Sequence, residues 1–271
     1  MPHFPFRAVI FTDLDETLLD RNYSWREAAP ALQKIRDLSI PLILTTSKTR
    51  GEVEAVQTEL GMGRQPFIPE NGGAVYFPSG YFGLSLEGAE EWAEYTLIRL
   101  GKPYREIRDF VEQVRVQIPL KGFGDFSVEE VSAKTGLSIP MAALAKEREF
   151  TEPFLLDDER ELPFLQNLAM KRGLKVTTGG RFHHLIGMEQ DKGRAVEETI
   201  RIFSSEGMDP VFIGLGDSPN DFPMLSRVDI PILIPRTGGS VNAPEIPGIV
   251  RAHFPGSRGW NESILRVLED F

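Results

Sequence analysis

The chain has 271 residues, 41% of them hydrophobic, which is enough for a large core domain with a second module. It has no cysteine, so disulfides and thiolate catalysis are excluded. Its net charge of −10 argues against a nucleic-acid partner, because such binding needs basic surface. No apolar run approaches the ~20 residues of a membrane span, so we expect no membrane partner and a cytoplasmic location.

The first part of the chain alternates between strand and helix patterns. Residues 8–12 predict a strand, because Ala8 to Phe11 form a continuous apolar run that is typical of a buried parallel strand. Apolar residues recur at helical spacing over residues 25–38, and residues 41–46 predict a second buried strand. A second helix is expected over residues 50–60, ended by Gly61. This order predicts an α/β fold with a doubly wound parallel sheet.

From about residue 84 the pattern changes to helices mixed with short strands. We expect helices over 87–100, 104–116, 141–147 and 161–172, strands at 149–150 and 154–156, and a hairpin of 174–178 with 182–186 joined by Gly179 and Gly180. The helix–strand alternation then resumes and ends in a helix near Leu268. We therefore predict a core made of residues 1–83 and 187–271, with an α+β cap inserted over residues 84–186.

Acidic pairs follow two of the predicted core strands. Asp13 and Asp15 come after the first strand, and Asp217 and Asp221 follow the apolar run that starts at residue 211. In open α/β sheets the ligand lies outside the carboxyl ends of the strands. If the two strands are neighbours, these acids form one site, and an all-oxygen site of this kind suits Mg²⁺.

Four short motifs along the chain resemble those of a known family. In chain order they are Asp13-x-Asp15-x-Thr17, Thr46, Lys192 and Gly216-Asp217-x-x-Asn220-Asp221. This is the order of the four motifs of the haloacid-dehalogenase-like phosphatases. The resemblance implies a Rossmann-like core, an inserted α+β cap, an Mg²⁺ cofactor and an aspartyl-phosphate intermediate.

The same resemblance implies a role for each catalytic residue. Asp13 would be the nucleophile, and Asp15 would first protonate the leaving oxygen and then deprotonate the hydrolytic water. Thr46 and Lys192 would bind the phosphoryl oxygens. Thr45 and Ser47 remain open as alternatives to Thr46, because an error of one residue is possible at a strand end.

The metal site is implied in the same way. Asp13, the main-chain carbonyl of Asp15, and Asp217 would hold Mg²⁺, with Asp221 and Asn220 supporting it. Glu16 departs from the common pattern, since many relatives have glycine there, and glycine eases a tight loop.

Further segments resemble the mannosyl-3-phosphoglycerate phosphatases. They are Arg148 to Phe154, Gly179 to His183, Thr46 to Thr49, Glu70 to Gly73 and Gly259 to Glu262. Arginine forks suit the phosphate and the glyceryl carboxylate of such a substrate, and an acid and a glycine turn suit sugar hydroxyls. The resemblance therefore implies that the substrate is bound by Lys48, Asn71, Gly72, Arg148, Glu152, Gly180, Arg181 and Asn220. The neighbouring His183 and His184 are expected to have packing or surface roles.

The sequence thus predicts a Mg²⁺-dependent phosphatase of a phosphorylated sugar derivative. Mannosyl-3-phosphoglycerate is the expected substrate, with mannosylglycerate as the product and compatible-solute synthesis as the purpose. Three alternatives stay open: a phosphatase of glucosyl-3-phosphoglycerate or another sugar phosphate, a phosphomutase, and a non-catalytic sugar-phosphate sensor. The sequence leaves the oligomeric state undetermined.

Overall fold

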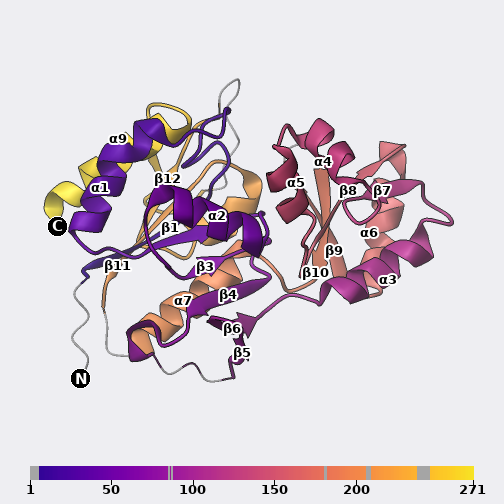
Figure 1. Ribbon diagram of the computed structural model, residues 1–271, viewed down its shortest axis with the longest axis horizontal. Helices are drawn as coiled ribbons and strands as arrows, with labels where there is room; N and C mark the ends of the chain where they lie inside the picture. The colour runs from indigo at the N-terminus through magenta and orange to yellow at the C-terminus, as the bar shows by residue number, and fades with distance from the viewer. Residues whose placement is uncertain (1–5, 85, 87, 180–181, 206–208, 237–244) are drawn as a thin grey trace.

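Two sheets organise the protein (Figure 1). The computed structural model describes residues 6–84, 86, 88–179, 182–205, 209–236 and 245–271. A nine-stranded sheet has the order β13-β12-β11-β1-β2-β3-β4-β6-β5, and a four-stranded sheet has the order β7-β8-β10-β9. In the described part of the chain, no helix is long and apolar enough to cross a membrane.

The larger sheet is parallel on one side and antiparallel on the other. Its strands are β13 (Val250–Arg251), β12 (Ile230–Leu233), β11 (Val211–Gly216), β1 (Ala8–Thr12), β2 (Leu42–Thr45), β3 (Phe67–Ile68), β4 (Ala74–Pro78), β6 (Tyr95–Arg99) and β5 (Glu90–Trp92). The strands from β13 to β3 run parallel, and the pairs β3–β4, β4–β6 and β6–β5 are antiparallel.

Helices cover both faces of this sheet. Successive residues of β1 point to opposite faces, so that Ile10 packs in one core cluster and Val9 and Phe11 pack in the other. Three helices contribute to the Ile10 side: α1 (Ala29–Asp37), α2 (Arg50–Leu60) and α9 (Gly256–Val267). Two contribute to the Val9 side: α7 (Lys192–Ser205) and α8 (Phe222–Leu225). This arrangement confirms the expected doubly wound α/β fold.

The smaller sheet is antiparallel and lies beside the larger one (Figure 1). Its strands are β7 (Leu120–Gly122), β8 (Glu152–Leu156), β10 (Phe182–Gly187) and β9 (Leu174–Gly179). The helices α3 (Tyr104–Val114) and α6 (Leu162–Met170) pack with Phe154 and Leu185 in one cluster. The helices α4 (Val128–Thr135) and α5 (Ile139–Ala145) pack with Phe182 in another. We call residues 101–190, which include this sheet, the insert.

The helix expected over residues 87–100 is wrong. The segment forms β5 and β6, which extend the larger sheet through β4. Tyr95 and Leu97 are buried while Thr96 and Ile98 are partly exposed, which is the period of a strand. We therefore propose that the inserted module begins after Leu100, which packs against the core, rather than at residue 84.

The strand expected at residues 149–150 is also absent. This segment lies in an irregular connection before β8, where Phe150 is buried in the core cluster on the Ile10 face of the larger sheet. A short apolar pair cannot be distinguished from a strand by its pattern alone, and here it anchors the insert to the core.

Candidate active site

The acids at the two strand ends come together because their strands are neighbours. β1 pairs in parallel with β11, so the residues that follow them emerge at the same edge of the sheet. Asp13, Asp217 and Asp221 are buried there, and each offers a carboxylate oxygen within 4.8 Å of the others. Thr17 Oγ1 lies 3.4 Å from both Asp13 Oδ2 and Asp217 Oδ1, and its one proton can be donated to either.

Two cations pair with this carboxylate cluster. Lys192 lies at the first position of α7, and its Nζ is 2.6 Å from both Asp13 Oδ1 and Asp221 Oδ1. Arg236 Nε is 2.5 Å from Asp217 Oδ2. The pattern of the sequence did not indicate Arg236, because it follows β12 with no motif around it.

Burial governs the charge states of these groups. It raises the pKa of Asp13 well above the usual value, because Lys192 offsets only part of the desolvation and Asp221 and Asp217 add repulsion. Burial, with Asp221, also raises the pKa of Asp217 to about 6 against the opposing effect of Arg236. For Lys192, burial lowers the pKa, but the Asp13 and Asp221 carboxylates outweigh it and raise the pKa above its usual value.

The donor set fits a small hard cation. All the candidate ligands are oxygens, and they are buried, close together and mutually repulsive. Mg²⁺ is held in proteins by one or two carboxylates with waters and substrate oxygens completing its octahedron. The three carboxylates therefore suit Mg²⁺ by their chemistry and their spacing.

The loop after β1 carries Asp15 and Glu16. Both oxygens of Asp15 pair with Lys48 Nζ, at 2.8 and 2.9 Å. Burial lowers the pKa of Lys48, but the adjacent Asp15 raises it above its usual value overall. Glu16 has φ of 56°, in the left-handed region, which gives a physical reason for the glycine that many relatives have there.

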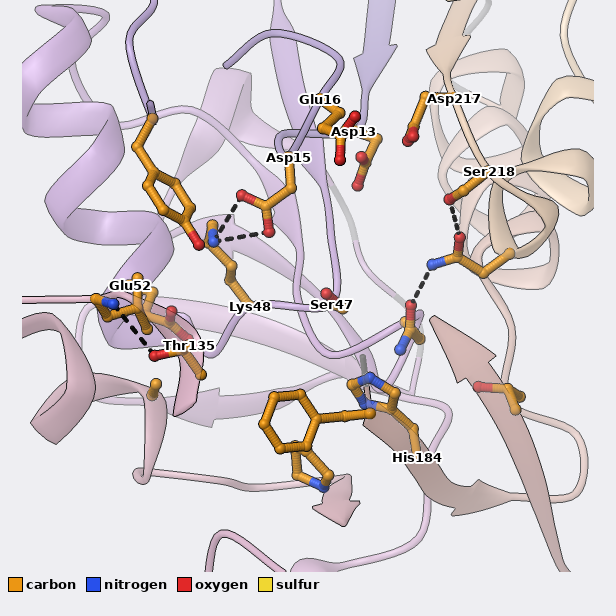
Figure 2. Close-up of a pocket in the computed structure, with 18 of the residues that line it drawn as sticks. Asp13, Asp15, Glu16, Ser47, Lys48, Glu52, Thr135, His184, Asp217 and Ser218 are labelled. Carbon is orange, nitrogen blue, oxygen red and sulfur yellow. Dashed lines mark hydrogen bonds and ion pairs between the residues drawn. The ribbon is translucent and has the colours of Figure 1, made fainter. Parts of the chain in front are cut away.

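A cavity of about 520 Å³ lies over the carboxylate cluster (Figure 2). The core side of its lining includes Asp13, Asp15, Ser47, Lys48 and Asp217. The insert contributes side chains to the same lining, including Phe123, Arg148, Phe182 and His184. A ligand in this cavity would touch both modules at once.

Comparison with known proteins identifies the family. A family model described as haloacid dehalogenase-like hydrolase matches residues 10–85. A Persephonella marina protein, named glucosyl-3-phosphoglycerate/mannosyl-3-phosphoglycerate phosphatase, is 52% identical over 97% of each chain. A Methanococcoides burtonii protein with the same name is 42% identical over 97% of each. The Pyrococcus furiosus mannosyl-3-phosphoglycerate phosphatase is 35% identical over 83% of this chain and 90% of its own. This chain belongs to the haloacid dehalogenase-like hydrolase family.

Solved structures share the fold of this hydrolase. A haloacid dehalogenase-like hydrolase from Bacteroides thetaiotaomicron matches with a TM-score of 0.67, covering 96% of this chain and 98% of its own at 15% identity. The sucrose-phosphatase from Synechocystis, in complex with sucrose and phosphate, matches with a TM-score of 0.60 over 96% and 98% of the two chains at 14% identity. At such identities the likeness concerns the fold alone.

The hydroxyl groups after β2 are divided between two environments. Thr46 is buried, and its Oγ1 accepts a 3.2 Å hydrogen bond from the Lys48 backbone N–H. Ser47 lines the cavity, as Figure 2 shows. The structure thus keeps Ser47 as a strong alternative to Thr46 for binding a phosphoryl oxygen.

The turn after β3 brings Asn71 and Gly72 to the site. Asn71 lines the cavity, and its Oδ1 accepts a 3.0 Å hydrogen bond from Asn220 Nδ2. Gly72 does not line the cavity. It has φ of 85°, and a Cβ there would lie 2.2 Å from the Asp191 carbonyl oxygen. Its conformation serves the close approach of two chain segments.

The expected substrate-binding residues of the insert have different outcomes. Arg148 lines the cavity of the hydrolase, where its NH1 donates to the Ser47 carbonyl at 2.8 Å. Gly180 and Arg181 lie outside the described residues. Glu152 is not brought to the cavity, because its fully buried carboxylate accepts hydrogen bonds from Tyr104 and the Gly124 N–H, and its part in sugar binding stays a prediction.

His184 was expected to have a packing or surface role, and that expectation is incomplete. It lines the cavity from β10, as Figure 2 shows. Strand alternation did indicate that His183 and His184 point to opposite faces. The pattern could not show which face meets the cavity, because that depends on how the insert docks.

Proposed function

We propose that this hydrolase is a Mg²⁺-dependent phosphatase that cleaves mannosyl-3-phosphoglycerate to mannosylglycerate and phosphate. The buried cluster of Asp13, Asp217 and Asp221, paired with Lys192 beneath a cavity, carries the proposal. The relatives support the substrate class, because they are named as phosphatases of mannosyl-3-phosphoglycerate or of both the glucosyl and mannosyl compounds.

The charge balance explains why a divalent ion is needed. Among the described residues, three carboxylates pair with two cations, Lys192 and Arg236, so this group of five has a net charge of −1 when its acids are ionised. That charge repels a phosphate dianion, while a bound divalent ion would make the cluster net positive. Asp13, Asp217 and Asp221 would hold Mg²⁺, which would neutralise charge on the phosphoryl oxygens.

The side chains of the site then divide the reaction into two steps. The carboxylate of Asp13 attacks phosphorus and forms an aspartyl-phosphate as the glyceryl oxygen leaves. Asp15 gives that oxygen its proton and afterwards takes one from the water that releases phosphate. Lys192 keeps Asp13 in place through its 2.6 Å ion pair.

Without substrate, the Asp15 carboxylate forms an ion pair with Lys48. Both carboxylate oxygens of Asp15 are held by Lys48 Nζ, at 2.8 and 2.9 Å, so this pair must open before Asp15 can reach the leaving oxygen. The glyceryl carboxylate offers Lys48 another anionic partner. We therefore expect substrate binding to draw Lys48 from Asp15, which would leave the acid free to protonate the leaving oxygen.

Phosphate release from mannosyl-3-phosphoglycerate tests the proposal. We expect release with Mg²⁺, none in excess chelator, and recovery when Mg²⁺ is restored. Asp13→Asn should abolish turnover, whereas Asp37→Asn, which changes an acid on α1 outside the site, should keep it. Full activity in chelator would exclude the metal, and activity in Asp13→Asn would exclude the nucleophile. Tight substrate binding without any phosphate release would favour the non-catalytic sensor.

Glucosyl-3-phosphoglycerate is the second candidate substrate. The two relatives that align over 97% of this chain have names that include both the glucosyl and the mannosyl compounds. Comparing kcat/KM for the two substrates under the same conditions decides between a selective and a dual enzyme. A ratio near one would favour the dual activity.

A further inference from the structure

His184 is a buried polar side chain with no hydrogen-bond partner among the described residues. Only 8% of its surface is exposed, and its Nδ1 is buried with no hydrogen-bond partner. Among the described residues, none hydrogen-bonds to its Nε2 either. Leaving ring nitrogens unpaired costs free energy, and Nε2, which unlike Nδ1 is not fully buried, is the nitrogen that a ligand in the cavity can reach.

The adjacent histidine shows the contrast. His183 lies on the opposite face of β10, where its Nδ1 is 3.1 Å from Thr178 Oγ1 and its Nε2 is 3.0 Å from Glu159. Both ring nitrogens of His183 thus have protein partners. The two residues share the same strand and a similar degree of burial, but only His184 lines the cavity.

The surroundings of His184 suit an uncharged polar group. Burial, with the nearby positive charge of Arg148 and the adjacent His183, lowers the pKa of His184 to about 3, so the ring is neutral near neutral pH. A neutral imidazole has one N–H donor and one nitrogen acceptor, which matches a hydroxyl group. Phe182 and Phe123 line the same cavity in an edge-to-face pair 5.0 Å apart and offer apolar surface beside it.

We propose that His184 is a specificity-determining residue that hydrogen-bonds a hydroxyl group of the substrate's sugar. The inference rests on the proposed function and deepens it. The phosphoryl group must meet Asp13 at the strand ends of the core, so the rest of the substrate extends toward the insert, where His184 lies. The cations Lys48 and Arg148 line the same cavity and suit the glyceryl carboxylate by their charge, whereas the neutral ring of His184 suits the sugar.

Three phosphate esters separate the parts of the substrate. Mannosyl-3-phosphoglycerate has the sugar and the carboxylate, 3-phosphoglycerate has the carboxylate alone, and p-nitrophenyl phosphate has neither. Steady-state kcat/KM is measured for each, in the wild type and in His184→Ala. The sugar contact predicts a loss about tenfold greater for the first ester than for the other two, which corresponds to one neutral hydrogen bond.

Two further variants guard against a structural effect. His184→Asn keeps a donor and an acceptor, so its selective loss should be smaller than that of His184→Ala. His183→Asn, on the opposite face, should leave the ratios among the three esters unchanged. Measurable turnover of p-nitrophenyl phosphate by each variant reports that the core is folded.

Three results would overturn the inference. Equal losses on all three esters would make His184 a structural residue, and unchanged ratios would remove it from the substrate. A loss shared by the two carboxylate esters would assign it to the glyceryl group instead of the sugar. If the wild type hydrolyses none of the esters, the proposed function itself is refuted. This outcome differs from the three above, in which the wild type is active and only the role of His184 fails.

Discussion

The residues around the cavity differ in charge from one side to the other. At the strand ends of the core, neighbouring acids raise the pKa values of Lys48 and Lys192 and keep both ammonium groups charged. On the insert, burial first and Arg148 second lower the pKa of His184 and keep it neutral. The cavity thus has an ionic end suited to a phosphate and a less charged end suited to a sugar.

The neutral state of His184 predicts a loss of stability in acid. The pKa of His184 falls from 6.5 to about 3 on folding. Between pH 6.5 and about pH 3, the unfolded chain therefore binds a proton at His184 and the folded chain does not. Stability is complete above the unfolded pKa and is lost as the pH falls below it, by about 2 kcal/mol at about pH 5. Besides burial, the groups that lower the pKa of His184 are Arg148 and His183.

Thermal unfolding at about pH 7 and about pH 5 measures this effect. His184→Asn cannot titrate, so the drop in its Tm between the two pH values should be smaller than that of the wild type by roughly 5 °C. His183→Asn provides the matched comparison. An equal drop in the wild type and His184→Asn would show that His184 is protonated in the folded state.

At the scale of elements, Glu70 joins the insert to the turn that carries Asn71. Its buried carboxylate accepts hydrogen bonds from the backbone N–H groups of Glu149 and Phe150, at 2.8 and 3.1 Å, and from Thr151 Oγ1 at 2.6 Å. The docked segment includes Phe150, which packs in the core. Glu70 belongs to the segment Glu70 to Gly73, which resembles a family motif. Its hydrogen-bond partners, however, lie 79 to 81 residues further along the chain, and no local pattern specifies them.

Glu70→Gln should weaken the contact between the turn and the segment of residues 149–151. The amide offers one acceptor oxygen where the carboxylate offers two, so at least one buried donor of the docked segment loses its partner, at a cost of about 1–3 kcal/mol. We expect a lower Tm and faster hydrogen exchange at the amides of Glu149 and Phe150. Glu90→Gln, at an exposed ion pair with Arg99, should change neither. Unchanged exchange in Glu70→Gln would show that packing alone docks the segment.

The elements that sequence predicted well are those with a strong local pattern. The strands β1 and β11 are unbroken apolar runs, and the acids after them lie where parallel strand ends place them. The helix α4 was missed although Ser127 and Glu130 form a capping box at its start, which was a readable signal. The strands β5 and β6 were missed because they form by pairing, β6 with β4 and β5 with β6, and no local pattern specifies these pairs.

Contacts between distant segments explain the remaining differences at the site. Glu152 has the chemistry of a sugar ligand, but Tyr104 and Arg108 from α3 bind its carboxylate and bury it. Arg236 carries no motif, and its ion pair with Asp217 follows from the loop after β12. Neither arrangement is encoded near the residue concerned, so reasoning from local sequence could not find it.

At the scale of the whole molecule, the carboxylate cluster joins segments from both ends of the core. Asp13 follows β1, Asp217 and Asp221 follow β11, and Lys192 begins the helix that leaves the insert. The cluster exists only when these segments have folded around one sheet. Any ion that binds it therefore binds the folded chain in preference to the unfolded one.

Mg²⁺ should consequently stabilise the entire fold. An ion at about 100 times its Kd adds about 2.7 kcal/mol to the free energy of unfolding, which raises the Tm by roughly 5–10 °C. Thermal unfolding in chelator and at increasing Mg²⁺ measures the rise without any substrate. Asp217→Asn removes a ligand charge and should flatten the dependence on Mg²⁺, whereas Asp37→Asn should keep the wild-type dependence. If Mg²⁺ raises the Tm of Asp217→Asn and the wild type equally, the stabilising ion binds outside this cluster. If it raises the Tm of neither, the three carboxylates do not hold Mg²⁺ in the absence of substrate.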